Sequence, residues 1–510
     1  MGRSLVPASE TGRLAPDQPV RITAGGLTYE LSRRRNDLYQ AEYRQDSSGQ
    51  DIFRVTWKLE YAIGSGVNGI TYAIRRGSYL FEAPLSYYSR TRTWELSPGY
   101  ENTNTGFSRL MPEACLTCHS GRVTPVAESP GRYLDPPFAE MAIGCENCHG
   151  PGELHAKRPA QNTIVNPARL SLRLSSDICM NCHEAGDTRA FQPGKTSADF
   201  RPGKPLSDTL AILKIPPSHS AGSRDLLEHN FSMMLSRCYR VSNGRMGCLT
   251  CHDPHRAPSD ATSSDTTRAA FYNSKCLTCH RVASCKLPGQ SRAHEASGCI
   301  GCHMPKADIG FISHSALTNH RIVRNVRQPL PEEAWHLTTP DLPDLIYLNR
   351  TNDKPLTPLM LLEAFGELSD RAPQYRDRYL QTLAQFSGTT SIPLVTAALG
   401  MKAFREGGPG ANATAIAYLT KAVDGGFNAP SAFETLATAL SAEGKAQQAI
   451  ATLKRGVELS PWEPRLQKLL ALEHIRARQY DLAKQTLKNY LDAFPEDQLV
   501  RDLLSKVGGQ

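Results

Sequence analysis

Alternating hydrophobic and polar residues predict β-strands in the first part of the chain. The alternation is clearest over residues 21–31, 52–57, 69–74 and 79–81, and glycine, asparagine and aspartate cluster between these runs. Short alternating runs separated by turn-forming residues are typical of antiparallel strands with one buried face. We therefore predict a small β-rich module over residues 1–110.

The last part of the chain has the hydrophobic periodicity of helices. Apolar positions recur every 34 residues, as at Ala415, Ala449 and Ala483, and this period is that of the tetratricopeptide repeat. We predict an all-α domain over residues 356–510, with a tetratricopeptide solenoid most evident over residues 395–496. Unrelated helical hairpins are the alternative. A solenoid of this kind offers a groove to a protein or peptide partner.

The middle of the chain holds every cysteine. The chain has 510 residues, enough for about three domains, and all 14 cysteines lie between Cys115 and Cys302. No apolar run is long enough for a membrane-spanning helix, so no transmembrane segment is predicted. Residues 325–355 are rich in proline and are predicted to form an extended linker before the helical domain.

Twelve of the cysteines belong to the pentapeptide Cys-x-x-Cys-His, which occurs six times. We number these copies motif 1 to motif 6 in chain order. Their first cysteines are separated by 30, 34, 69, 28 and 23 residues. The cysteine pairs are Cys115 and Cys118, Cys145 and Cys148, Cys179 and Cys182, Cys248 and Cys251, Cys276 and Cys279, and Cys299 and Cys302. The histidines that close the motifs are His119, His149, His183, His252, His280 and His303.

This pentapeptide is the pattern of covalent c-type haem attachment. Two thiols three residues apart add to the two vinyl groups of one porphyrin, and the adjacent histidine binds the iron as its proximal ligand. Zinc sites would use the cysteines four at a time, and dithiol redox motifs occur singly. We therefore predict six covalently bound haems c. Because the motifs are too close for separate domains, the haems form the core of a mostly irregular and α-helical cytochrome c domain over residues 111–324.

Further histidines of this region are candidates for the distal iron ligands, and there are enough of them to cap all six irons. His255 lies too close to motif 4 to cap the haem of that motif, so we expect it to cap a neighbouring haem. His155 follows a Gly-Pro-Gly turn that can direct it towards an adjacent ring. The seven candidates are His155, His219, His229, His255, His294, His314 and His320.

Other residues leave alternatives open. Methionine ligation would raise the potential of a haem, although methionine more often fills a core. Cys238 and Cys285, which lie outside the motifs, form a disulfide or remain inert thiols. His336 and His474 are predicted as surface or packing residues. The methionines of the region are Met111, Met233, Met234, Met246 and Met304.

The motif segments resemble those of a known family. They read Cys-Glu-Asn-Cys-His-Gly-Pro-Gly at 145–152, Cys-Leu-Thr-Cys-His-Asp-Pro-His at 248–255 and Cys-Ile-Gly-Cys-His-Met-Pro at 299–305. These stretches resemble the bacterial multihaem c-type cytochromes related to the tetrahaem cytochrome c of ammonia oxidisers, many of which are fused to tetratricopeptide repeats. The resemblance implies electron transfer to redox partner proteins through bis-histidine haems, in the periplasm or outside the cell.

We therefore predict a multihaem electron carrier with a repeat domain for partner docking. The family also has catalytic relatives, so the alternative is an oxidoreductase that reduces a small nitrogen or sulfur oxyanion at one open haem. A scaffold with structural haems is a third hypothesis. The 58 basic and 50 acidic residues give a net charge of +8, which the haem propionates would largely offset, so no nucleic-acid partner is predicted.

Haem attachment outside the cytoplasmic membrane implies a secretory signal, but no apolar segment follows Met1. We therefore hypothesise that the sequence starts late and that a further motif lies upstream. An in-frame stop codon immediately before Met1 in the genomic DNA would refute this hypothesis.

Overall fold

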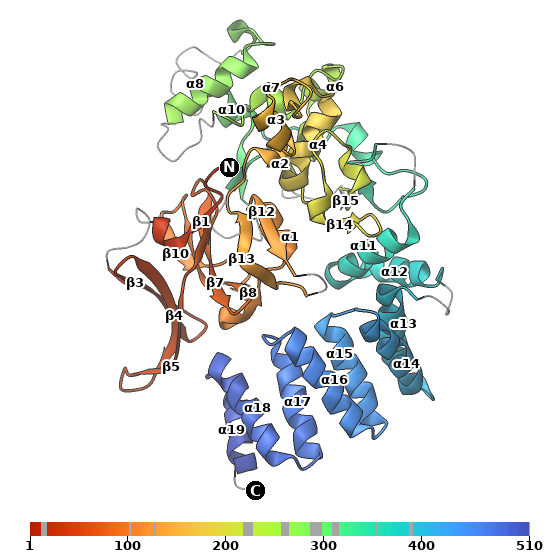
Figure 1. Ribbon diagram of the computed structural model, residues 1–510. Helices are drawn as coiled ribbons and strands as arrows, with labels where there is room; N and C mark the ends of the chain where they lie inside the picture. Colours follow the sequence, from red (N-terminus) through yellow and green to blue (C-terminus); the bar gives the residue numbers. More distant parts are fainter. Residues whose placement is uncertain are drawn as a thin grey trace.

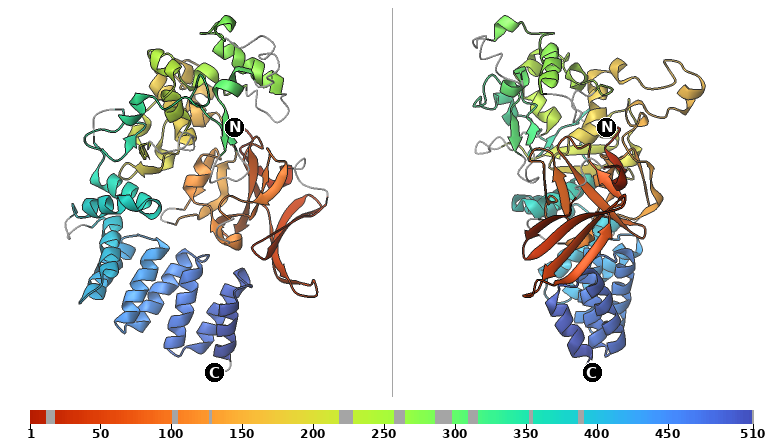
Figure 2. Two further views of the ribbon diagram at one scale, coloured as in Figure 1. Left: turned by 180° about the vertical axis from the view of Figure 1, so that it is seen from behind. Right: turned by 90° about the vertical axis from the view of Figure 1, so that its left-hand side faces the viewer.

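The chain follows a path that returns to its beginning. From the N-terminal β-strands it passes through the cysteine-rich region to a column of helices, and the last helices lie beside the first sheets again (Figures 1 and 2). The computed structural model describes residues 1–11, 18–100, 105–126, 129–217, 228–256, 265–285, 298–308, 316–351, 355–386 and 391–508.

The N-terminal module consists of antiparallel sheets, which confirms the predicted β-rich region. One sheet has the order β2-β3-β4-β5, and the other has the order β1-β6-β7-β8-β11, with β9 pairing with both β7 and β10. The strands are β1 (Leu5–Pro7), β2 (Val20–Ala24), β3 (Leu27–Arg34), β4 (Asp37–Gln45), β5 (Asp51–Lys58), β6 (Tyr61–Ile63), β7 (Gly69–Arg76), β8 (Tyr79–Glu82), β9 (Leu85–Tyr88), β10 (Thr93–Leu96) and β11 (Arg109–Leu110).

The cysteine-rich region combines short helices with three small antiparallel sheets, β12-β13, β14-β15-β18 and β16-β17. The helices are α1 (Glu113–Thr117), α2 (Glu146–His149), α3 (Glu153–Lys157), α4 (Leu172–His183), α5 (His229–Met234), α6 (Arg237–Val241), α7 (Cys248–Cys251), α8 (Asp265–Cys276) and α10 (Gly298–His303). The strands are β12 (Arg122–Pro125), β13 (Tyr133–Glu140), β14 (Thr188–Phe191), β15 (Leu210–Lys214), β16 (Lys306–Asp308), β17 (Ala316–Thr318) and β18 (Ile346–Tyr347).

These small sheets add strands to a region that the sequence predicted as mostly irregular and α-helical, and helices and irregular segments still make up most of its described residues. Strand β15 shows why the sequence did not reveal them. All five of its residues are buried, so the strand has no alternation of hydrophobic and polar positions. A short continuous apolar run of this kind cannot be told from a buried helical segment by periodicity.

The proline-rich segment 325–355 is not a free linker. Its strand β18 pairs with β15, and Leu345 and Ile346 are buried in the hydrophobic core. The wholly buried Asn349 accepts a hydrogen bond from the Ile212 N–H at 2.7 Å and donates one to the Leu210 carbonyl at 2.8 Å. Because its backbone and side chains complete this sheet, the segment belongs to the folded core.

We expect the variant Asn349→Ala to lower the free energy of unfolding by about 2–4 kcal/mol, because it leaves one buried N–H and one buried carbonyl without a partner. Urea unfolding followed by circular dichroism measures the change. The matched variant Asn68→Ala alters an exposed asparagine and should shift the free energy by less than about 0.5 kcal/mol. Equal small effects of the two substitutions would contradict a structural role for Asn349.

The C-terminal helices form the predicted all-α solenoid. Helices α15, α17 and α19 begin at residues 430, 464 and 498, so the period of 34 residues is also the period of the structure. Among the described residues, none of the helices has both the length and the apolar character needed to cross a bilayer. The helices are α11 (Pro358–Arg371), α12 (Arg376–Leu383), α13 (Pro393–Glu406), α14 (Ala411–Asp424), α15 (Pro430–Ala442), α16 (Ala446–Leu459), α17 (Pro464–Arg476), α18 (Tyr480–Ala493) and α19 (Gln498–Gly508).

The turns of the solenoid dock on the β module. Trp462, between α16 and α17, is only 8% exposed and joins the hydrophobic core of the β module. Its ring centroid lies 4.5 Å from that of Tyr79 and 5.9 Å from that of Phe81. The Arg501 guanidinium lies 3.9 Å from the centroid of the Phe53 ring. Aromatic packing thus joins the two ends of the chain, an arrangement that the sequence did not predict.

Candidate functional site

Three of the motifs fold locally so that their reactive side chains share a face. In motifs 2, 4 and 5 the N–H of the closing histidine donates to the carbonyl of the first cysteine, at 2.9–3.0 Å. This bond makes one helical turn, which places side chains three and four residues apart on the same side. The two thiols and the imidazole can therefore contact a single planar group.

The motifs lie next to one another in space. Thiols of different motifs lie side by side: Cys118 of motif 1 neighbours Cys182 of motif 3, and Cys179 of motif 3 neighbours Cys248 of motif 4. Motif 5 and motif 6 meet in the same way, through Cys276 and Cys299. Motif 3, at the end of α4, therefore contacts both motif 1 and motif 4.

A cavity of about 590 Å³ lies at motif 2 and is lined by Cys145, His149, His155 and His255. The ring centroids of His149 and His255 are 5.9 Å apart, with an angle of 24° between the ring planes. Metal–nitrogen bonds are about 2 Å long, so two imidazoles on opposite sides of one ion have centroids on the order of 6 Å apart. His149 and His255 are thus spaced to hold one metal ion between them.

A hydrogen bond to the backbone orients His149. The Nδ1 atom of His149 lies 2.8 Å from the Val165 carbonyl oxygen. Because a carbonyl only accepts, Nδ1 carries the proton and Nε2 keeps its lone pair. Metal-binding histidines commonly have such a partner. His303 of motif 6 has the same arrangement, with Nδ1 at 2.6 Å from the Val323 carbonyl oxygen.

Four further imidazoles form a continuous series, which we call the histidine row. The ring centroids of His183 and His229 are 5.5 Å apart, those of His229 and His320 are 4.1 Å apart, and those of His320 and His252 are 6.1 Å apart. The outer members close motifs 3 and 4, and the inner members are two of the predicted distal histidines. The row therefore connects two motifs through their candidate ligands.

The inner members of the row are held as neutral imidazoles. Desolvation lowers the pKa of His229 to about 3, with a further contribution from His320. Desolvation also lowers the pKa of His320 to about 4, and the electrostatic effect of His252 lowers it further. The Nδ1 atom of His320 lies 3.0 Å from the Thr318 carbonyl oxygen, which leaves Nε2 with the lone pair. A neutral imidazole is the form that binds a metal.

The remaining candidates divide into two groups. His219, His294 and His314 lie outside the described residues. His155 lines the cavity of its own motif 2, where its Nδ1 atom is 2.9 Å from the Thr163 hydroxyl oxygen. In the part of the chain that the structure describes, no ring contact joins the motif histidines His119, His280 and His303 to another histidine.

The structure also places the residues for which the sequence left alternatives open. Cys238 and Cys285 are both free thiols, so the disulfide is not formed. Met111 is buried in the hydrophobic cluster that includes Leu116 and Tyr133. His336 is exposed and His474 is buried within the solenoid, as expected for surface and packing residues.

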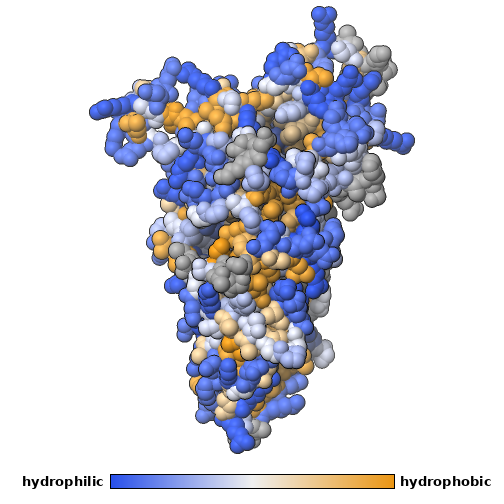
Figure 3. Space-filling model, turned by 90° about the vertical axis from the view of Figure 1, so that its right-hand side faces the viewer, coloured by the Kyte–Doolittle hydropathy of each residue, from blue (hydrophilic) through white to orange (hydrophobic). Residues whose placement is uncertain are grey.

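Hydrophobic side chains near the motifs have little protein to pack against. Among the described residues from 237 to 322, Ala269 is the only buried hydrophobic residue. In the same segment Val241, Leu277 and Val282 are 62%, 43% and 59% exposed. Hydrophobic residues also reach the surface between polar ones on the face shown in Figure 3. The described residues therefore supply little protein core around motifs 4 to 6.

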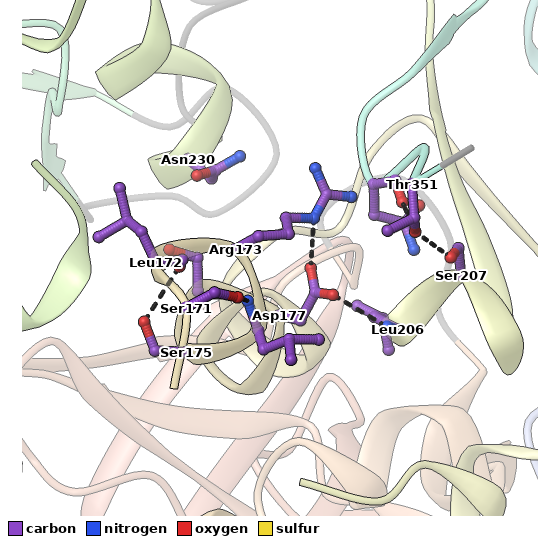
Figure 4. Close-up of polar contacts among 12 residues, drawn as sticks. Ser171, Leu172, Arg173, Ser175, Asp177, Leu206, Ser207, Asn230 and Thr351 are labelled. Atoms are coloured by element: carbon purple, nitrogen blue, oxygen red, sulfur yellow. Dashed lines mark hydrogen bonds and ion pairs between the residues drawn. The ribbon is translucent and has the colours of Figure 1, made fainter. Parts of the chain in front are cut away.

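Buried carboxylates that the sequence analysis did not identify anchor helix α4. Asp177 is wholly buried, accepts a hydrogen bond from the Leu206 N–H at 3.0 Å and pairs with Arg173 at 3.1 Å (Figure 4). Glu184, directly after His183, is also wholly buried, and burial raises its pKa to about 8. The sequence does show that these acidic residues lie beside a motif. It does not show their hydrogen-bond partners, which are distant in sequence.

Comparison with known proteins gives a distant relative of this chain. The chain is 25% identical over 323 residues to the dissimilatory sulfite reductase MccA of Wolinella succinogenes. This match covers 58% of the present chain but 38% of the relative. The chain thus spans well under half the length of that protein.

The C-terminal helices match a family model. The model of the tetratricopeptide repeat covers residues 440–507. Solved structures with similarity include a tetratricopeptide protein of Thermus thermophilus, at 16% identity and a TM-score of 0.25, covering 31% of this chain and 84% of that one. The first tetratricopeptide domain of human RPAP3 gives 20% identity and a TM-score of 0.21, covering 23% of this chain and 91% of that one. The helices over residues 440–507 therefore form tetratricopeptide repeats.

Proposed function

We propose that this protein is a multihaem c-type cytochrome that transfers electrons through six covalently bound haems. The observation that carries the proposal is the histidine row, in which two motif histidines and two distal candidates lie in contact. In this proposal His183 and His229 hold the haem of motif 3, His252 and His320 hold that of motif 4, and His149 and His255 hold that of motif 2.

The spacing within the row suits electron transfer between neighbouring sites. The centroid distances of 5.5 Å and 6.1 Å match two imidazoles on one ion, whereas the 4.1 Å between His229 and His320 is ring-to-ring contact. Bound haem iron supplies one-electron redox chemistry. The protein contributes by fixing the imidazoles, keeping them neutral and bringing the two ligand pairs into contact.

The scarcity of protein core around motifs 4 to 6 also supports the proposal. A folded segment needs a buried apolar interior, and Ala269 alone does not provide it. Porphyrin rings attached at these motifs would cover exposed side chains such as Leu277. The haems would thus act as structural core and as cofactors.

The proposed location and the proposed kind of partner follow from the haem sites and from the repeats. Covalent haem attachment favours a periplasmic or extracellular location, and the repeats favour docking of a redox partner protein. The turns between the repeat helices already contact the β module through Trp462. A partner would therefore bind surfaces of the repeats other than these turns.

The test is purification of the protein from a host that assembles cytochromes c. We expect intact-mass spectrometry to show six haems per chain, one for each motif, and ferric spectra dominated by low-spin iron. A denatured protein that retains no haem would exclude covalent attachment. Replacing both cysteines of motif 2 by alanine should remove one haem and no more.

A second function is favoured by the similarity to a sulfite reductase. The chain could reduce a small sulfur oxyanion at one haem without a distal protein ligand. Oxidation of a reduced viologen dye that depends on added sulfite would support this function. The absence of such turnover in a protein with entirely low-spin haem would leave the electron carrier as the proposed function.

A further inference from the structure

We propose that Glu184 is a positioning residue that holds His229 opposite His183. The proposal rests on the proposed function, because it concerns the two imidazoles that would bind the haem of motif 3. It goes further in assigning a role to a residue that lies outside every motif and binds no haem itself.

Glu184 joins the two ligand segments through hydrogen bonds. Its two carboxylate oxygens accept hydrogen bonds from the backbone N–H groups of Asn230 at 2.7 Å and Phe231 at 3.0 Å. These groups belong to the first turn of α5, which begins at His229. Glu184 itself is bonded to His183 through the main chain. One side chain therefore connects the residue after the proximal histidine to the residues after the distal one.

A second bond runs in the opposite direction. The carboxylate of Glu228 accepts a hydrogen bond from the Ala185 N–H at 2.9 Å. Glu184 and Glu228 thus form a reciprocal pair, which we call the carboxylate clamp, across the segments 183–185 and 228–231. The clamp fixes the backbone on both sides of the 5.5 Å separation between the His183 and His229 rings.

The burial of Glu184 makes its contacts specific. The residue is 0% exposed, so bulk water does not compete with its side chain for the N–H groups of Asn230 and Phe231. The first N–H groups of a helix lack partners within the helix and need an acceptor. Without Glu184, the start of α5 would have to shift to find one, and His229 would shift with it.

Asp177 provides a matched comparison, since it lies in helix α4, which ends directly before Glu184. It is also 0% exposed and also accepts a backbone N–H, that of Leu206 at 3.0 Å. Its partner segment, residues 206–208, carries no candidate ligand. Loss of Asp177 therefore reports the structural effect of removing a buried carboxylate, without moving His229.

The experiment compares the holoproteins of the parent, Glu184→Ala, Glu184→Gln and Asp177→Asn. Haem content is measured by mass spectrometry, spin state by electron paramagnetic resonance, and open coordination positions by carbon monoxide titration of the reduced protein. We expect Glu184→Ala to gain one carbon monoxide-binding haem per chain relative to the parent. Glu184→Gln, which keeps one acceptor oxygen, should show a smaller gain, and Asp177→Asn should show none.

The outcomes separate this proposal from the proposed function. A parent protein without covalent haem would contradict the proposed function. A Glu184→Ala protein with the full haem content and no additional open haem would overturn the role of Glu184 alone, as would an equal gain in Asp177→Asn. If Glu184→Ala does not fold, Glu228→Ala tests the same clamp, since it removes the bond to the Ala185 N–H together with the electrostatic effect of Glu228 on Glu184. No gain of carbon monoxide binding in that variant would then overturn the proposal.

Discussion

Replacing His320 by alanine is expected to convert one of the six predicted haems from low-spin to high-spin iron. His320 lies 6.1 Å from His252 and 4.1 Å from His229, measured between ring centroids. In the proposed assignment the substitution removes the distal ligand of motif 4 and interrupts the histidine row. A weak-field ligand such as water would then occupy the open position, and the haem would bind carbon monoxide when reduced.

The control for this variant is His336→Ala. His336 is exposed and pairs with Glu332 at 3.1 Å, outside the row. The His336→Ala variant should leave the spin state of every haem unchanged. Low-spin spectra identical to those of the parent in a fully loaded His320→Ala protein would contradict the assignment of His320 as a ligand. Rapid-mixing reduction of both variants would show whether the row also carries the electrons, since only His320→Ala should slow the reduction.

Replacing Trp462 by alanine is expected to separate the repeat domain from the β module. Trp462 is 8% exposed and packs on Tyr79 and Phe81. Removal of a buried tryptophan costs about 3–5 kcal/mol, including the cavity left behind. Because the side chain joins two domains that each have their own core, much of this loss should appear as detachment rather than as unfolding of either domain.

Hydrogen exchange measured by mass spectrometry checks this expectation. We expect faster exchange in β8 and in the turn at 460–463, with little change within α15 and α16. The matched variant Leu499→Ala removes an apolar side chain that is 81% exposed and should leave the exchange unchanged. Unaltered exchange at both surfaces in Trp462→Ala would show that the contact does not hold the two domains together.

The regular parts of the fold were predictable because their signals are local. Strand alternation predicted the β module, and the recurrence of Ala415, Ala449 and Ala483 predicted the repeats. By contrast, β15 is buried on both faces, and β18 lies in a segment whose prolines suggested a linker. Their pairing depends on Asn349 and on residues more than 130 positions earlier, as the separation of 137 residues between Asn349 and Ile212 shows. No local pattern reports such a contact.

In the candidate site, too, some contacts were predictable from the sequence and others were not. The motif thiols and their histidines are set by spacing within five residues, because a single helical turn is enough to bring them together. The candidate distal histidines are different, since His229 and His320 are distant in sequence from the motif histidines that they face. The sequence supplied seven candidates but no pairing among them. It showed that Glu184 lies beside a motif but not what Glu184 binds, because its partners lie 46 and 47 residues away.

The sequence by itself determined which chemistry is predicted for this protein. Six Cys-x-x-Cys-His motifs specify the kind of ligand and the prediction of six haems, and the 34-residue period specifies the repeats. Only the tertiary structure decided which imidazoles meet, how the motifs follow one another in space, and that the repeats return to the β module through Trp462. The physical reason is that covalent and helical geometry act over a few residues. The contacts that form the histidine row and the carboxylate clamp exist only after distant segments have packed together.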